Sequence, residues 1–301
     1  MQARRVPPPT TRDWLLLLLL SFMWGTSFLA TRVTVLAWPA TTVVAARLLL
    51  GLLVLLVVLR ASGHALPRDG AAWGRYLLLA LLGNVVPFTL ITWGQGGIDS
   101  GLAAILLAVM PLGTLVLAHF TIEGERMTPA RTAGFTIGFL GLVLLVGPAA
   151  LRRLGGDPST LAHQLAVIGG ALCYSANAIV ARRLPAAPAL VNTTASVGVA
   201  TAIMVPIALG LDRPWTLPVT AATGLAIAWL GVVSTAVAIV VYFAIIASAG
   251  PTFLALTNYL IPIVAVVAGV VGLDEELAPR AIVALVVILS GIAVSQRQRR
   301  P

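Results

Sequence analysis

Residues 101–148, GLAAILLAVMPLGTLVLAHFTIEGERMTPARTAGFTIGFLGLVLLVGP, decide how the chain folds. They contain two apolar segments separated by a short charged turn, and the first segment carries Pro111 near its middle. Residues 251–296, PTFLALTNYLIPIVAVVAGVVGLDEELAPRAIVALVVILSGIAVSQ, follow the same plan, with Pro262 in the place of Pro111. The offset is 262 − 111 = 151 residues at the prolines and 150 at the charged turns. The sequence therefore indicates an internal duplication, in which one unit occurs twice along the chain.

The composition indicates an integral membrane protein. The 301 residues are 59% hydrophobic and 10% charged, whereas a soluble domain has about a quarter charged residues. A membrane-spanning helix needs about 20 predominantly apolar residues. Uninterrupted apolar runs such as Leu15–Leu20 exclude a β-barrel, whose strands alternate apolar and polar residues. Ten spans are predicted, at 14–33, 38–59, 74–93, 99–119, 129–148, 162–181, 189–209, 218–246, 251–271 and 279–296.

The formal charge of +9 comes from 19 arginines and no lysine. These arginines are scattered through short loops rather than clustered, which favours positive-inside topology over nucleic-acid binding. Ten spans place both termini on one side, and the loops on that side hold thirteen arginines against five on the other. We therefore predict cytoplasmic termini. The first span follows Arg4, Arg5 and Arg12 as a signal peptide would, but it lacks a small-residue cleavage site, so we expect it to be retained.

The two halves each contain five spans. At an offset of 150, Trp24 aligns with Tyr174 and Ser27 with Asn177. Because five is odd, the second half must enter the membrane from the opposite face, which gives inverted repeats of the kind found in transporters. The predicted divisions are a tail at 1–13, a first repeat at 14–148, a link at 149–161, a second repeat at 162–296 and a tail at 297–301.

The order and duplication of several short motifs make the chain resemble the drug/metabolite transporter superfamily, EamA type, over nearly its whole length. The motifs are Trp24-Gly25, the mid-span prolines Pro111 and Pro262, and the turns Gly124-Glu125 and Asp274-Glu275. The resemblance implies an all-α membrane protein of ten helices in two inverted five-helix repeats, located in a bacterial inner membrane. Within the superfamily the chain is most similar to exporters of amino acids, including aromatic ones.

Polar and aromatic residues inside apolar spans usually face a bundle interior or a cavity. Amide, hydroxyl and aromatic groups together could hold an amino acid by its two ends while stacking on its side chain. The alternative is that the same residues hold helices together or mark the membrane interface. The candidate cavity residues are Trp24, Asn84, Phe88, Trp93, Met110, Tyr174, Asn177, Tyr242, Asn258 and Tyr259.

Two prolines and two charged or titratable residues have a possible role in the transport cycle. Pro111 and Pro262 each remove a backbone donor and tend to kink a helix, which would shape a cavity and let it gate, or would merely improve packing. Arg47, near the middle of a span, either contacts a substrate carboxylate or extends to the membrane interface. His119 ends the fourth span, where its imidazole either makes a charge contact or has only a structural role.

Capping and close packing account for a second set of residues. Glu125 and Glu275 lie in turns near helix N-termini, where the helix dipole favours a carboxylate. Gly134, Gly138 and Gly141 share one face of the fifth span. This small-residue pattern predicts close packing within the bundle, with a dimer contact as the alternative.

The absences matter as well. No Asp or Glu falls in the middle of a span, so we expect no obligatory proton coupling. An intramembrane enzyme would need histidines or paired carboxylates inside the spans, and the three histidines lie in loops or at span ends. We expect no enzyme activity, no metal and no cofactor. The expected partners are a small-molecule substrate and the bilayer; a multidrug or nucleotide-sugar carrier is the alternative within transport, although nucleotide sugars call for several basic pocket residues.

Overall fold

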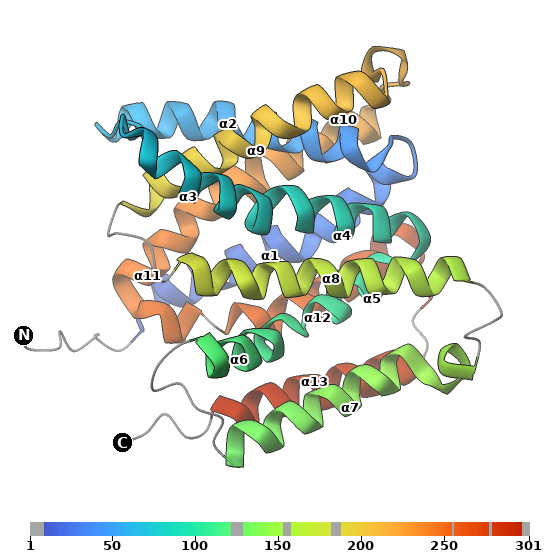
Figure 1. Ribbon diagram of the computed structural model, residues 1–301. Helices are drawn as coiled ribbons and strands as arrows, with labels where there is room; N and C mark the ends of the chain where they lie inside the picture. Colours follow the sequence, from blue (N-terminus) through green and yellow to red (C-terminus); the bar gives the residue numbers. More distant parts are fainter. Residues whose placement is uncertain are drawn as a thin grey trace, which may run out of the picture.

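The computed structural model describes residues 9–121, 129–152, 158–181, 188–254, 256–276 and 279–296. These parts of the chain fold into helices joined by short connections (Figure 1). The α-helices are α1 Thr11–Val35, α2 Ala40–Ala61, α3 Gly70–Ala80, α4 Val86–Gly97, α5 Ser100–Leu107, α6 Met110–Thr121, α7 Pro129–Arg152, α8 Pro158–Ala181, α9 Ala189–Leu211, α10 Ala221–Ala228, α11 Ala238–Leu254, α12 Thr257–Leu273 and α13 Pro279–Gln296. Two π-helical segments, η1 Leu81–Val85 and η3 Trp229–Val237, and a 3-10 turn, η2 Pro214–Thr216, complete the set.

The helices run roughly parallel or antiparallel to one another, so that each repeat crosses the bundle five times (Figure 1). In the first repeat the passes are α1, α2, the run α3–η1–α4, the pair α5 and α6, and α7. The start of α1 and the end of α13 lie at the same end of the bundle, on the left in Figure 1. We call this end the near face, because it is near the termini, and the opposite end, on the right, the far face. Helix α1 runs from the near face to the far face and α8 runs the other way. The predicted ten-helix fold of two inverted repeats is confirmed.

The outer surface of the bundle is apolar. Side chains such as Leu15, 63% exposed, and Val57, 68% exposed, point away from the protein. Within the described residues, seven helical runs are long and apolar enough to cross a bilayer, and three shorter apolar helices accompany them. Exposed apolar side chains around fully hydrogen-bonded helices are what a lipid environment requires. The chain is a multi-pass membrane protein.

Glycines let α7 and α13 approach closely. These helices lie side by side along the lower edge of the view in Figure 1. A methyl group at Gly291 would lie 2.4 Å from the backbone nitrogen of Gly138 and 2.6 Å from the carbonyl oxygen of Gly134. One at Gly141 would lie 2.8 Å from Ile288. The glycine face of α7 thus packs on α13 of the same chain, as the close-packing prediction has it.

Both π-helical segments lie in the third pass of a repeat, where the sequence predicts uninterrupted α-helix. In η1, the wider turn precedes Pro87, which cannot donate to the carbonyl four residues earlier. In η3, the Thr235 hydroxyl donates to the carbonyl of Leu230, five residues earlier, at 2.8 Å. No proline accompanies η3, and nothing in the sequence explains its wider turn. Such segments often lie at functional sites because they free carbonyl groups from the helical pattern.

Several predicted boundaries are wrong. The fourth span is two helices, because the chain leaves helical geometry at residues 108 and 109, immediately before Pro111. The eighth pass continues to Leu254 rather than ending near residue 246, and α12 begins at Thr257 rather than at residue 251. Pro262 lies inside α12. Uniform hydropathy hides such breaks, since apolar residues on either side of a break look alike in sequence.

Helix α7 reaches Arg152 and α8 begins at Pro158, so both helices extend into the predicted link 149–161. Residues 153–157 lie outside the described residues. The two predicted tails fall largely on residues 1–8 and 297–301, which lie outside the described residues. Residues 122–128, which include Glu125, lie outside them as well.

Candidate functional site

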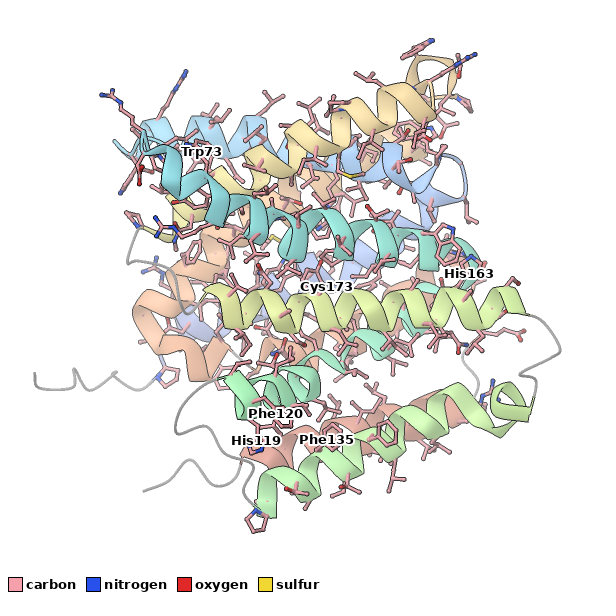
Figure 2. The ribbon with its side chains drawn as sticks, in the orientation of Figure 1. Trp73, His119, Phe120, Phe135, His163 and Cys173 are labelled. Atoms are coloured by element: carbon pink, nitrogen blue, oxygen red, sulfur yellow. The ribbon has the colours of Figure 1, made fainter. Side chains whose placement is uncertain are left out.

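Two pairs of aromatic side chains lie where the two repeats meet. Trp24 of α1 contacts Tyr242 of α11, with ring centroids 5.9 Å apart. Phe88 of α4 meets Tyr174 of α8 edge to face at 6.4 Å. Figure 2 shows Cys173, the residue before Tyr174, midway along α8. Each pair joins one residue from each repeat, so both pairs belong to the interface between repeats. Together with Arg47, these residues form what we call the central cluster.

The π-helical segment η3 anchors Trp24. The indole Nε1 of Trp24 donates to the carbonyl oxygen of Ser234 at 3.2 Å. The Ser234 hydroxyl in turn donates to the carbonyl of Met23 at 2.9 Å. Residue Gly25 keeps the other side of α1 close to α12, because a methyl group there would lie 2.6 Å from Val264. The Trp24-Gly25 motif therefore has two functions: the glycine packs, and the tryptophan is held toward the second repeat.

Arg47 points into the bundle. Its Nε donates to the Thr235 hydroxyl of η3 at 3.0 Å, and its Cζ lies 4.0 Å from the centroid of the Phe88 ring. The cation stands over an aromatic face, an arrangement worth about 2 kcal/mol where water is excluded. These contacts place the guanidinium among residues of both repeats. The structure does not extend Arg47 toward the membrane interface.

Two amide side chains accompany the aromatic residues. Asn177 lies one turn beyond Tyr174 on α8, and its Oδ1 is a buried atom without a hydrogen-bond partner. Gly83 makes room for this amide, since a methyl group there would lie 3.0 Å from the Asn177 Nδ2. Asn84 lies beside Gly83 in η1 and is partly exposed. An unpaired buried acceptor in a native fold needs an explanation.

Met110 begins α6 at the break in the fourth span. Its carbonyl oxygen accepts hydrogen bonds from the Ser175 hydroxyl of α8, at 2.8 Å, and from the Thr114 hydroxyl, at 3.0 Å. These bonds compensate for the helical pattern that is lost ahead of Pro111. The structure therefore assigns to Met110 a backbone contact between repeats beside Tyr174.

A second polar cluster closes the far face, and we call it the far-face cluster: Arg32, Gln95, Asp99, Ser100 and Glu275. The Glu275 carboxylate accepts from the Ser100 backbone N–H at 2.8 Å, from the Ser100 hydroxyl at 2.7 Å and from the Gly101 N–H at 3.2 Å. A capping role for Glu275 was predicted, and the helix it caps is α5 of the opposite repeat. Sequence reasoning missed this partner, which lies about 175 residues away.

Arg32 and Gln95 complete the far-face cluster. Arg32 donates to the carbonyl oxygen of Gln95 and lies 3.9 Å from the Asp99 carboxylate. The Gln95 side chain is fully buried and donates to the carbonyl of Phe28 at 2.8 Å. Burial, followed by the charge of Glu275, raises the pKa of Asp99, and Arg32 opposes that effect in part. The cluster thus joins α1, α4, α5 and the end of α12.

Three predicted site residues are not brought to the central cluster. Trp93 is 45% exposed and stacks on His163 with centroids 4.3 Å apart, near the far end of α8 in Figure 2. His119 contacts Phe120 edge to face at the near end of α6. Asn258 is exposed. The side chain of Tyr259 lies outside the described residues.

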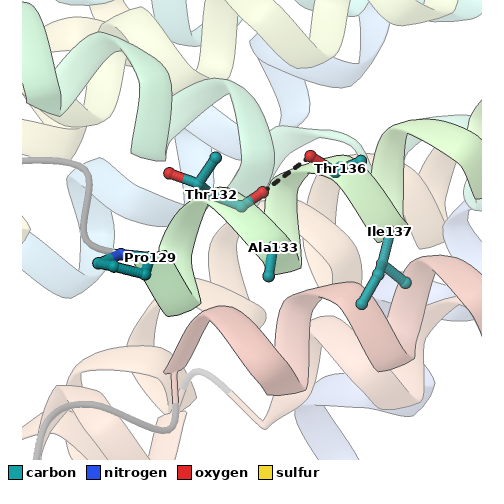
Figure 3. Close-up of a pocket in the computed structure, with 5 residues that line it drawn as sticks. All are labelled: Pro129, Thr132, Ala133, Thr136 and Ile137. Atoms are coloured by element: carbon teal, nitrogen blue, oxygen red, sulfur yellow. Dashed lines mark hydrogen bonds between the residues drawn. The ribbon is translucent and has the colours of Figure 1, made fainter.

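A shallow depression of about 660 Å³ lies on the surface of α7 (Figure 3). It is lined by Pro129, Thr132, Ala133, Thr136 and Ile137. The Thr136 hydroxyl donates to the Thr132 carbonyl at 3.0 Å, so that side chain satisfies its own helix. None of the five residues belongs to the central cluster, and the depression offers no charged group to a ligand.

The fold and the central cluster define a membrane transporter built from inverted repeats. The EamA-like transporter family model matches residues 13–147 and again residues 162–296. The chain belongs to this family, within the drug/metabolite transporter superfamily, and is not an enzyme.

Relatives support the same assignment. The chain is 24% identical over 264 residues to "Uncharacterized inner membrane transporter YedA" of Escherichia coli K12, covering 85% of this chain and 81% of that protein. It is 24% identical over 296 residues to "Uncharacterized transporter YvbV" of Bacillus subtilis, covering 95% and 92%. The match to "Uncharacterized transporter YoaV" of B. subtilis, 27% identical, covers 51% of each chain, so the chain spans about half the length of that relative.

A solved structure described as "Crystal structure of protein" has the same fold. It matches 97% of this chain and 100% of its own, with a TM-score of 0.69 and 22% sequence identity. At that identity the likeness concerns the fold alone.

Proposed function

We propose that this protein exports small metabolites across a bacterial inner membrane, principally amino acids including aromatic ones, with broad specificity. The observation that carries the proposal is the central cluster, in which Trp24 and Phe88 of one repeat meet Tyr242 and Tyr174 of the other. Aromatic faces suit flat apolar side chains, and Arg47 among them suits a carboxylate. A drug or other metabolite carrier of the same superfamily is the alternative.

Alternating access follows from the position of the cluster. In transporters with inverted repeats, the substrate lies at the repeat interface and one repeat rocks against the other around it. The helical breaks at residues 108 and 109 and at the start of α12 supply places where the passes can bend. We propose that Pro111 and Pro262 promote this bending, because each removes a backbone donor from its helix.

The proposed orientation places both termini in the cytoplasm. The count of thirteen arginines in the predicted loops on the side of the termini, against five in the opposite loops, supports it. A relative whose name describes an inner membrane transporter, YedA, agrees with the membrane proposed. In that orientation the far-face cluster would face the periplasm.

Counterflow in proteoliposomes tests the substrate proposal. We expect purified protein to accelerate movement of labelled phenylalanine, tyrosine or tryptophan, and the Trp24→Ala variant to lose most of that flux, because its indole both lines the cluster and bonds η3. Asn258→Ala, at an exposed position, serves as the comparison. If none of the amino acids is transported and a drug-like cation is transported instead, the result would support the alternative carrier.

We also expect no obligatory proton coupling. The carboxylates in the described passes lie at their ends, as Asp13 does in the first turn of α1, and a proton-coupled carrier commonly keeps one near the midplane. At equal substrate concentrations on the two sides, an imposed pH gradient should therefore drive no net amino acid flux. Substrate accumulation driven by the pH gradient alone contradicts this prediction.

A further inference from the structure

Arg47 has no anionic partner among the residues that the structure describes. It is the eighth residue of α2, about 10 Å from the start of that helix at 1.5 Å per residue. Its described contacts are the neutral hydroxyl of Thr235 and the face of Phe88. In the described part of the chain, the ion pair within 4 Å joins Arg32 to Asp99, and none reaches Arg47. A guanidinium at this depth keeps its full charge and favours any anion that arrives beside it.

The described contacts of Arg47 leave the outer end of the guanidinium, with its two terminal nitrogens, for an anion. Thr235 occupies the Nε–H, and Phe88 covers one face of the guanidinium plane. The two terminal nitrogens, Nη1 and Nη2, keep their parallel N–H groups for a ligand. A carboxylate matches that pair of donors in a bidentate, in-plane geometry. Because the side chain is held by both repeats, this direction is defined before a ligand binds.

The cation has no counterpart in the second repeat. Pro39 and Pro188 begin the second and seventh passes at an offset of 149 residues, which aligns Arg47 with Ser196. Ser196 donates its hydroxyl to the Thr193 carbonyl of its own helix. A site with one cation on one side suits a molecule with one anionic end.

Asn177 supplies a complementary group on the other repeat. Its buried Oδ1 has no partner, and it lies three residues, or about 4.5 Å of helix, beyond Tyr174. Tyr174 contacts Phe88, which contacts Arg47. The central cluster thus places an acceptor without a donor, at Asn177, near a cation without an anion, at Arg47. A zwitterion would supply both missing partners.

We propose that Arg47 binds the carboxylate of the transported molecule end-on through Nη1 and Nη2, and that Asn177 accepts a hydrogen bond from an amino group of the same molecule. Thr235 and Phe88 position the guanidinium. The inference rests on the proposed transport function and narrows its substrates to amino carboxylates. Esters, amides and simple amines of the same shape are excluded, because they leave the Arg47 charge uncompensated.

Binding of four related probes to the full-length protein in lipid nanodiscs tests the inference: L-phenylalanine, its methyl ester, 3-phenylpropionate and phenethylamine. Wild-type protein should bind phenylalanine most tightly, 3-phenylpropionate next, and the ester and the amine at least about 100-fold more weakly, the loss expected for a missing bidentate charged pair. Arg47→Met should lose about 100-fold in affinity for both carboxylates, and Arg47→Lys about 10-fold. Asn177→Leu should weaken phenylalanine but not 3-phenylpropionate.

Arg60→Met, at an exposed position on the same helix, is the matched control and should bind all four probes as wild type does. If Arg47→Met does not fold, Arg47→Lys carries the comparison. Equal binding of the ester and phenylalanine to wild type would overturn the carboxylate anchor even if amino acids are transported. Arg47-dependent binding of 3-phenylpropionate without binding of phenylalanine would keep the anchor, and would overturn both the Asn177 role and the amino acid proposal. No binding of any probe would overturn the inference entirely.

Discussion

We expect the Glu275→Ala variant to open the far face. In the wild-type protein one carboxylate accepts three hydrogen bonds at the N-terminus of α5, two from backbone N–H groups and one from the Ser100 hydroxyl. Ser100 is fully buried, so removing the acceptor leaves these donors without a partner. Losing such a set costs about 2.0–2.7 kcal/mol, or roughly a 30–100-fold larger population of the open form.

Hydrogen exchange measures this opening directly. Peptides that cover residues 98–104 should exchange about 30–100-fold faster in Glu275→Ala than in wild type. Glu275→Gln should fall between the two, because the amide keeps one acceptor oxygen but loses the charge that favours a helix N-terminus. Unchanged exchange in both variants would show that Glu275 does not hold α5 in place.

Asp99→Asn is the informative comparison for the far-face cluster. The pKa of Asp99 is raised, first by burial and then by Glu275. A raised pKa means that the closed far face disfavours the charged carboxylate, so protonation, or the neutral asparagine, should hold it at least as firmly. For the same reason, the closed form should become more stable relative to the open form as the pH falls through the raised pKa of Asp99. Exchange at residues 98–104 should therefore stay level or slow down in Asp99→Asn, opposite to Glu275→Ala.

The second large effect is expected at the contact between α7 and α13. The Gly291→Ala methyl group would lie 2.4 Å from the Gly138 nitrogen and 2.6 Å from the Gly134 carbonyl oxygen. Backbone atoms cannot rotate away as a side chain can, so α13 must move off α7. Overpacking of this kind costs about 1–3 kcal/mol, and a larger residue such as leucine costs more.

Thermal unfolding in detergent, followed by circular dichroism, checks the prediction. Gly291→Ala should lower the melting temperature. Gly224→Ala, on α10, is the control: a methyl group there meets nothing within 4 Å, and alanine favours a helix by about 1 kcal/mol over glycine. Its melting temperature should hold or rise. The prediction is wrong if the two alanine variants melt alike.

The central cluster also shows what a search for polar residues can and cannot find. Trp24, Tyr174 and Tyr242 stand out in sequence because large aromatic residues interrupt aliphatic spans, and the structure pairs Trp24 with Tyr242 and Tyr174 with Phe88. Trp93 has the same signature and lies elsewhere, stacked on His163. The residue type is alike in both cases, whereas the position along the pass and the direction of the side chain differ. That direction depends on the local helix geometry, including the two π-helical segments.

The amino-acid sequence by itself determined the membrane class, ten passes and two inverted halves. Apolar runs of about 20 residues admit few alternatives in a bilayer, and a duplicated odd number of passes forces inversion. Tertiary structure alone decided the breaks at residues 108 and 109, the cap that Glu275 places on α5, and the pairing of Arg47 with Thr235 and Phe88. The Glu275 cap and the Arg47–Thr235 hydrogen bond join residues of opposite repeats, up to about 190 positions apart. Hydropathy records only how apolar each residue is, whereas such contacts depend on how the helices rotate and pack against one another.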